Sequence, residues 1–267
     1  MTGFIRDDLN HKGTFNQVAI LYNKARPIYP DALFERLISV AALAPKAKLV
    51  EIGPGTGQAT RPLADRGYEI IAIELGQDLA DIARQELKDY SNVTVITGNF
   101  EGTDLPAHNF DLVYAATAFH WIKPESRYAK PHSLLKSAGH LAIIHTNHVA
   151  DEQGNVFFNA SQPIYDKYYG DDGKEKPKLP ASADVKPTEL DDRLFELTDF
   201  SCFPMIVEYT ATEYAHLLNT YSPTLALPEN KRADFLDDIE LLINKEFDGK
   251  VSKHFVMSMT IAETRRI

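Results

Sequence analysis

The segment that decides the fold reads, in order, Leu49-Val50-Glu51-Ile52-Gly53-Pro54-Gly55-Thr56-Gly57-Gln58. Its mostly apolar beginning is typical of a short strand buried within a parallel sheet. The three glycines at alternate positions then predict a turn in which the backbone can approach a ligand closely. We expect a helix over 57–66 behind this turn, so the segment forms a strand, a ligand-binding turn and a helix in succession.

The chain after this segment continues the alternation of strands and helices. Apolar runs predict strands at 69–74, 93–97, 110–116 and 140–146, with helices at 77–89 and 124–137. Parallel neighbours need such crossover helices, and two later strands, 203–209 and 251–261, complete the set. The sequence therefore predicts an α/β fold with a doubly wound, mainly parallel, seven-stranded sheet.

We expect one domain over residues 1–267, divided into four parts. The parts are N-terminal helices that cover the site (1–45), a ligand-binding core (46–146), a cap insertion (147–187), and C-terminal strands and helices that complete the sheet (188–267). The third part interrupts the alternating pattern with glycines and four prolines, which is typical of a lid or an insertion.

Composition narrows the possible partners. The 28 basic and 38 acidic residues give a formal charge of −10, and the lysines near residue 176 are interleaved with acidic residues. We therefore expect no nucleic acid partner. No apolar run reaches the roughly 18–20 residues that span a bilayer, so we expect no membrane partner. A single cysteine, Cys202, fits a reducing compartment and indicates a cytoplasmic protein.

The glycine-rich turn alone leaves a dinucleotide site open as a rival interpretation. The dinucleotide-binding pattern requires a third glycine at the position where this chain has Gln58. In addition, the negative charge of the Glu51 carboxylate disfavours binding of a pyrophosphate. Glu51 suits an ammonium instead, held through water, such as that of S-adenosylmethionine. Glu74 ends the next strand, seventeen residues beyond Gly57, where its carboxylate can accept both hydroxyls of a ribose. A solvated strand-end carboxylate is the alternative for Glu74.

Several motifs resemble those of a known family. They are EIGPGTG (51–57), IAIE (71–74), TGNFE (97–101), FDLVYAATAFHW (110–121), LLKSAGHL (134–141), an N-terminal Tyr22…Arg26-Pro27…Tyr29-Pro30, and YTATEY…TYS (209–222). This set is similar to the class I S-adenosylmethionine-dependent methyltransferases, and within them to the type-11, trans-aconitate-methyltransferase-like branch. The resemblance implies a Rossmann-like methyltransferase fold, an enzyme, and S-adenosylmethionine as its cofactor.

The resemblance also implies which residues bind the cofactor. They are Tyr22, Arg26, Glu51, Gly53, Pro54, Gly55, Gly57, Glu74, Leu75, Asn99, Phe100, Ala116 and Thr117. Tyr22 and Arg26 stand four residues apart on one helical face, and the resemblance implies a helix that covers the methionine end of the donor. Many relatives carry aspartate where Asn99 stands, so this residue accepts from the adenine amino group without charge assistance.

On the acceptor side, we predict His120 as the catalytic residue, with Tyr29 and Trp121 binding substrate. His120 follows the fourth strand, at the sheet edge where open α/β folds place ligands. It acts either as a base on a hydroxyl or, when protonated, as an anchor for a carboxylate. The alternatives without a functional role are that His120 is a loop histidine bonded by the backbone and that Trp121 only packs.

The predicted function is methylation of a small molecule, and the family supplies O-methylation of a carboxylic acid as the reaction. A non-catalytic S-adenosylmethionine-binding module is the first alternative, and an NAD-dependent oxidoreductase is the second. The fourth strand ends in Ala116-Thr117-Ala118-Phe119, which lacks the Asn/Asp-Pro-Pro-aromatic motif of nucleic-acid amino methyltransferases. Carboxylate and amide ligands for a hard cation are also missing there, so we predict no metal.

Overall fold

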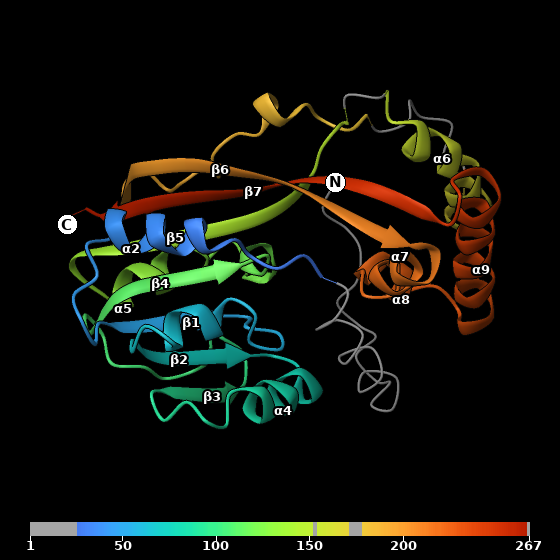
Figure 1. The fold of residues 1–267 in the computed structure, drawn as a ribbon. Helices are drawn as coiled ribbons and strands as arrows, with labels where there is room; N and C mark the ends of the chain where they lie inside the picture. The colour runs from blue at the N-terminus through green and yellow to red at the C-terminus, as the bar shows by residue number, and fades with distance from the viewer. Residues whose placement is uncertain (1–25, 152–153, 171–177, 266–267) are drawn as a thin grey trace.

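A computed structural model describes residues 26–151, 154–170 and 178–265 (Figure 1). Its seven-stranded sheet has the order β3-β2-β1-β4-β5-β7-β6. The strands are β1 (Lys48–Ile52), β2 (Glu69–Glu74), β3 (Val93–Thr97), β4 (Phe110–Ala116), β5 (Leu135–His148), β6 (Phe195–Thr210) and β7 (Lys250–Thr264). Strands β1 to β5 pair in parallel, whereas β7 runs antiparallel between β5 and β6. The predicted α/β fold is confirmed.

Helices cover the sheet where its faces are apolar. Helix α2 (Asp31–Val40) and the short α3 (Thr60–Ala64) bury leucines and a phenylalanine against one face, on which Tyr114 and Ile144 lie. The other face packs against α5 (Ala129–Leu134) and the 3₁₀ turn η1 (Phe119–Trp121), while α4 (Gln77–Glu86) lies along β2 and β3. The sheet is thus buried between two layers, as its apolar strands require.

One predicted boundary is wrong. We expected a helix over 124–137, but α5 ends at Leu134 and β5 begins at Leu135. The strand starts early because Leu135 pairs with Phe110, and a turn with Ala138 at φ +61° precedes the regular pairing that begins at His140. Tertiary pairing here outweighs the helical spacing of the sequence.

Four helices form a cap at one end of the long strands. They are α6 (Val156–Tyr169), α7 (Ala211–Leu218), α8 (Ser222–Leu225) and α9 (Glu229–Glu246). Figure 1 shows α7, α8 and α9 on the side toward which the arrows of β2, β3 and β4 point. The cap has its own apolar core, in which Phe157, Tyr214 and Phe235 meet. A capping box of Thr210 and Glu213 begins α7 directly after β6.

The cap therefore draws on two parts of the predicted division. Helix α6 belongs to the 147–187 segment, and its Phe157 ring packs edge-on against Tyr214 of α7 at a centroid distance of 5.1 Å. Helices α7, α8 and α9 come from the C-terminal part, where only β6 and β7 extend the sheet. Tyr22 lies outside the described residues, so its predicted role stays a prediction.

Candidate active site

The glycine loop between β1 and α3 has a conformation that side chains rarely adopt. Gly53, Gly55 and Gly57 have φ values of +65°, +59° and +91°. A Cβ added at Gly53 would lie 2.6 Å from the Cβ of Ala118, so the loop lies directly against the turn after β4. Glycine is required here both by the backbone angle and by the close approach. The loop is a cradle into which a ligand can be brought against bare backbone.

Glu74, at the end of β2, ties this loop to the sheet. Its Oε2 accepts a hydrogen bond from the Gly55 N–H at 3.0 Å, and its Oε1 accepts one from the Gly76 N–H at 2.9 Å. Burial raises the pKa of the carboxyl, and the Gly76 and Gly55 N–H groups oppose that shift. Each carboxylate oxygen has a second lone pair, so a ribose diol can share both oxygens with the loop.

Glu51, at the end of β1, is fully buried. Its Oε2 accepts hydrogen bonds from the Thr60 hydroxyl at 2.5 Å and from the Tyr114 hydroxyl at 2.8 Å. Its Oε1 has no partner among the described residues. Burial raises the pKa of Glu51 to about 7. A buried oxygen without a partner beside a glycine cradle fits a ligand that brings a cationic donor, such as the ammonium of S-adenosylmethionine.

A cavity of about 220 Å³ lies where the glycine loop, the ends of β4 and β5, and the cap meet. Its lining residues are Arg26, Pro27, Tyr29, Gln58, Thr117, Thr146, His148 and Tyr221. The structure thus brings together three of the predicted site residues, Arg26, Tyr29 and Thr117. They are far apart in sequence from the cap residue Tyr221 that completes the wall.

Thr117 is strained at the rim of this cavity. Its φ is +58°, which is uncommon for any residue other than glycine and costly for a β-branched one. Its N–H donates to Ile144 O at 2.8 Å, and its hydroxyl is 2.9 Å from the hydroxyl of Tyr29. Backbone strain of this kind gathers at functional sites, and here it turns the chain sharply at the carboxyl end of β4.

Comparison with known proteins finds similarity to methyltransferases. Residues 50–143 match a family model described as "Methyltransferase domain". An uncharacterized methyltransferase-like protein of Schizosaccharomyces pombe is 26% identical over 221 residues, which are 82% of this chain and 81% of that protein. An uncharacterized methyltransferase of Mycobacterium tuberculosis is 26% identical over 131 residues, 49% of this chain and 51% of the relative. That match therefore spans about half the relative's length.

The residues that match the methyltransferase family model include the glycine loop, Glu51 and Glu74. Among solved structures, a phosphoethanolamine N-methyltransferase 2 of Haemonchus contortus, in complex with S-adenosylhomocysteine, has a TM-score of 0.54 at 12% identity. The alignment covers 98% of this chain and 60% of that one, and it shows a shared fold.

The remaining predicted cofactor residues follow the carboxyl ends of β2 and β3. Leu75 is 60% exposed beside Glu74, so its side chain is accessible, and its predicted role stays a prediction. Asn99 accepts the Glu101 N–H through its side-chain oxygen at 2.8 Å, whereas the Phe100 ring is buried in the core. The Asn99 oxygen therefore already shapes its own loop, and Phe100 serves packing as well as any ligand.

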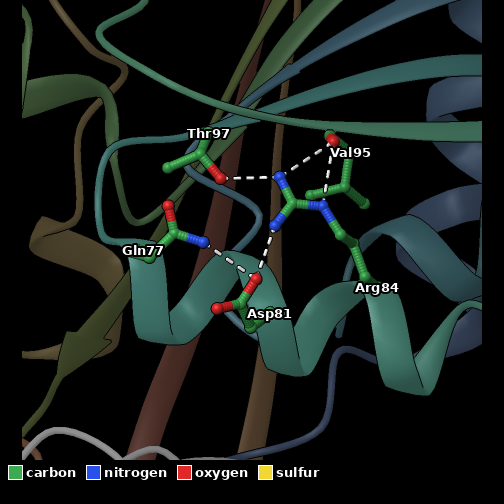
Figure 2. A network of polar contacts seen from close by, with 5 residues as sticks. All are labelled: Gln77, Asp81, Arg84, Val95 and Thr97. Atoms are coloured by element: carbon green, nitrogen blue, oxygen red, sulfur yellow. Dashed lines mark hydrogen bonds and ion pairs between the residues drawn. The ribbon is translucent and has the colours of Figure 1, made fainter.

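Arg84 of α4 holds the end of β3 in place (Figure 2). Its guanidinium donates to Val95 O at 3.2 Å and to the Thr97 hydroxyl at 2.6 Å, and it forms an ion pair with Asp81 at 2.7 Å. Gln77 donates to the same Asp81 carboxylate at 2.9 Å. The network fixes the strand from which the Asn99 loop departs.

Arg26 lies against the cap. Its Nε donates to the Thr220 hydroxyl at 3.0 Å, its Nη2 donates to Thr220 O at 3.1 Å, and its guanidinium lies 4.5 Å from the centre of the Tyr221 ring. The resemblance implies that this residue covers the methionine end of the donor. That role stays a prediction, and the geometry adds a second one, because Arg26 joins the N-terminal segment to the cap.

His120 and Trp121 lie on η1, outside the cavity lining. Their rings are 4.8 Å apart, Trp121 is 59% exposed, and Arg127 donates to His120 O at 3.3 Å. Burial, followed by the charge of Arg127, lowers the pKa of His120. Burial, followed by the charge of His120, lowers the pKa of His145 on β5. The predicted catalytic and substrate-binding roles stay predictions.

Sequence reasoning missed His148, Thr146, Gln58 and Tyr221 as lining residues. The signal for the first two is strand alternation, since Thr146 and His148 continue the face of β5 on which Ile144 is buried. Tyr221 lies in the TYS motif (220–222), but no site role was predicted for it, and it reaches the cavity only through the fold of the cap. Among the described residues, no cluster of three or more His, Cys, Asp or Glu side chains is arranged to hold a metal ion.

Proposed function

We propose that the chain transfers the methyl group of S-adenosylmethionine to a carboxylate oxygen of a small organic acid. The cavity between the glycine loop and the cap carries this proposal. Arg26 and His148 line it, and none of its described lining residues is acidic. A volume of about 220 Å³ suits a compact acceptor, and a guanidinium suits a carboxylate. The resemblance to the trans-aconitate-methyltransferase-like branch supports the same acceptor class.

The donor would be held by residues of the sheet edge. Glu74 would accept from the ribose, Leu75 and Asn99 would border the adenine, and Glu51 would face the ammonium through its unpartnered oxygen. Gly53, Pro54, Gly55 and Gly57 would bring the backbone against the methionine end, beside Ala116 and Thr117. When bound, the donor supplies a sulfonium-activated methyl group.

Methyl transfer from a sulfonium requires little covalent participation by the protein. The carboxylate oxygen supplies the electron pair of the new O–C bond, and the electrons of the broken C–S bond remain on sulfur. Positioning of the nucleophile in line with that bond supplies much of the rate. A carboxylate needs no base, so His120 would act as a base only for a hydroxyl acceptor.

We propose a small-molecule partner and no nucleic acid. A net charge of −10 opposes a polyanion, and the cavity admits a compact group. Within the described ranges, no helix is both long and apolar enough to cross a bilayer. The single cysteine, which is exposed, supports the proposal of a cytoplasmic site of action.

Incubation with methyl-labelled S-adenosylmethionine and a fractionated metabolite extract tests the proposal. We expect label in the small-molecule fraction, released by mild alkali as from a methyl ester. Label that resists alkali would contradict the carboxylate acceptor, and label in RNA or protein would contradict the small-molecule class. Binding of S-adenosylhomocysteine without transfer to any fraction would favour a non-catalytic binding module instead.

A further inference from the structure

His148 lies at the end of β5 and lines the cavity. Its Nε2 lies 3.2 Å from the Tyr221 hydroxyl, and its ring packs 4.8 Å from the centre of the Phe255 ring. Phe255 is its pairing partner on β7, so the imidazole is held from the sheet side and from the cap side. Its orientation is therefore set by two different elements.

The second ring nitrogen is available to a ligand. No described residue forms a hydrogen bond with Nδ1 of His148, and this atom is not among the buried polar atoms of the described residues that lack a partner. It is therefore accessible, and the residue lines the cavity. An imidazole that lines a cavity and is held through one nitrogen can use the other nitrogen to recognise one polar group there.

The surroundings keep this imidazole neutral. Burial, followed by the charges of Lys253 on β7 and Arg26 in the N-terminal segment, lowers the pKa of His148 to about 4. Tyr221 from the cap is the other polar group against the ring, and Phe255 is apolar. At neutral pH the ring thus carries a single N–H, and the hydrogen bond with Tyr221 decides which nitrogen bears it.

We propose that His148 determines acceptor specificity by donating its Nδ1–H to the acceptor carboxylate, while the Tyr221 hydroxyl donates to Nε2 and fixes this tautomer. The inference rests on the proposed carboxylate-methylating function and identifies His148 as the residue that recognises the acceptor. Arg26 on the same cavity supplies the charge that attracts the carboxylate. A neutral donor orients the carboxylate without adding a second full charge, which would make its oxygen a poorer nucleophile.

The test measures binding of succinate, citrate and benzoate to the protein saturated with S-adenosylhomocysteine. We expect the tightest of these to lose about tenfold in affinity in His148→Ala, as for a hydrogen bond to a charged group. His148→Asn, which keeps a donor, should recover part of the loss. Tyr221→Phe keeps the ring beneath Arg26 and should weaken binding several-fold. The affinity for S-adenosylhomocysteine should stay within about twofold in all three variants.

His145→Ala is the matched control, because His145 lies on the same strand and points to the other face. Its Nε2 lies 3.1 Å from the Thr188 hydroxyl. It should bind the carboxylate as the parent does. Nitrogen NMR of the labelled histidines should show His148 as the Nδ1–H tautomer, with a shift of that proton when the carboxylate binds.

The outcomes separate the two proposals. If none of the three carboxylates binds the parent protein, the proposed acceptor class is wrong, and the inference about His148 is wrong as well. If a carboxylate binds the parent and His148→Ala equally well, only the inference is overturned. An equal loss in His145→Ala, or an Nε2–H tautomer at His148, would also overturn it.

Discussion

The two walls of the candidate site differ in how the chain builds them. The sheet-edge wall, formed by the ends of β1 and β2, draws Glu51, the glycine loop and Glu74 from 24 consecutive residues. The cap wall draws Arg26, His148 and Tyr221 from three segments that lie far apart in sequence. A wall made from one contiguous segment can be recognised as a motif, whereas the cap wall exists only after the chain has folded.

The two walls also differ in charge. Two buried carboxyls, Glu51 and Glu74, have raised pKa values at the sheet edge because burial disfavours their charge. Behind the cap wall, burial lowers the pKa values of His148 and Lys253. His148 is thus neutral at neutral pH, and Arg26 supplies the positive charge of the cap wall. Carboxyls on one wall and a guanidinium on the other suit a reaction that brings a cationic donor and an anionic acceptor together. Four substitutions test this contrast, in order of decreasing effect.

The largest expected effect is at His120, which lies outside both walls. As a base or anchor for the acceptor, its loss in His120→Ala should lower turnover by about 10²–10⁴-fold for a base, or raise the acceptor KM for an anchor. Donor affinity should not change. Steady-state kinetics and calorimetry with S-adenosylhomocysteine measure these quantities.

The pH dependence distinguishes the two roles of His120. Its pKa lies below the usual 6.5, so a base is neutral and active above that lowered value, and the rate should rise with pH and then level off. An anchor must be protonated, and the rate should fall over the same range. Unchanged turnover and acceptor KM would show that the chemistry belongs to the two walls alone and that His120 is a loop histidine.

Glu74→Ala should weaken S-adenosylhomocysteine binding by about 30- to 1000-fold, because the ribose loses a bidentate acceptor. The structure adds a cost that the sequence does not indicate, since the Gly55 and Gly76 N–H groups lose their partner as well. Glu69→Ala, at the exposed start of the same strand, is the control and should bind as the parent does. Binding within threefold of the parent in Glu74→Ala would remove this residue from the cofactor site.

Glu51→Gln should have two effects of opposite sign. Since the folded pKa is raised from 4.5 to about 7, the ligand-free protein has its full stability below pH 4.5 and loses it as pH rises through 7. The full loss is roughly 3 kcal/mol, and glutamine avoids it. Urea unfolding should show the variant more stable than the parent at pH 8 and similar at pH 4.5.

The same variant should bind S-adenosylhomocysteine about tenfold more weakly, because the ammonium loses a charged partner. The matched substitution Glu86→Gln, at an exposed ion pair with Arg61, should change neither property. A Glu51→Gln protein with the parent's pH profile would show that the buried carboxyl is not ionised near neutral pH.

The smallest expected effect is at Lys253. The free energy of unfolding depends on pH here in the opposite sense to that described for Glu51. Burial lowers its pKa from 10.5 to about 8, against the attraction of Asp151. The parent protein therefore has its full free energy of unfolding above pH 10.5, and it loses part of it as pH falls through 8. Lys253→Met should raise the unfolding free energy at pH 7 by about 1–3 kcal/mol, and the gain should shrink by pH 10. An equal gain at both pH values would contradict the assigned cause.

Much of the fold was predictable because its signals are local. Apolar runs marked all seven strands, and the glycines at 53, 55 and 57 marked the loop between β1 and α3. Local spacing also identified Glu51 and Glu74, which the structure places at the ends of adjacent strands. Helix α5 was predicted too long, because the pairing of Leu135 with Phe110 outweighs helical spacing.

By itself, the sequence determined the order of strands and helices, the glycine-rich turn after the first strand, and the carboxylates that end β1 and β2. These depend on neighbours within a few residues, where backbone angles and strand alternation act. Only the tertiary structure decided that α6 shares a core with α7 and α9, and that Arg26 and His148 meet Tyr221. Those contacts join residues more than 50 positions apart, and no local preference predicts them, because they form only when burial of the cap's apolar faces brings the segments together.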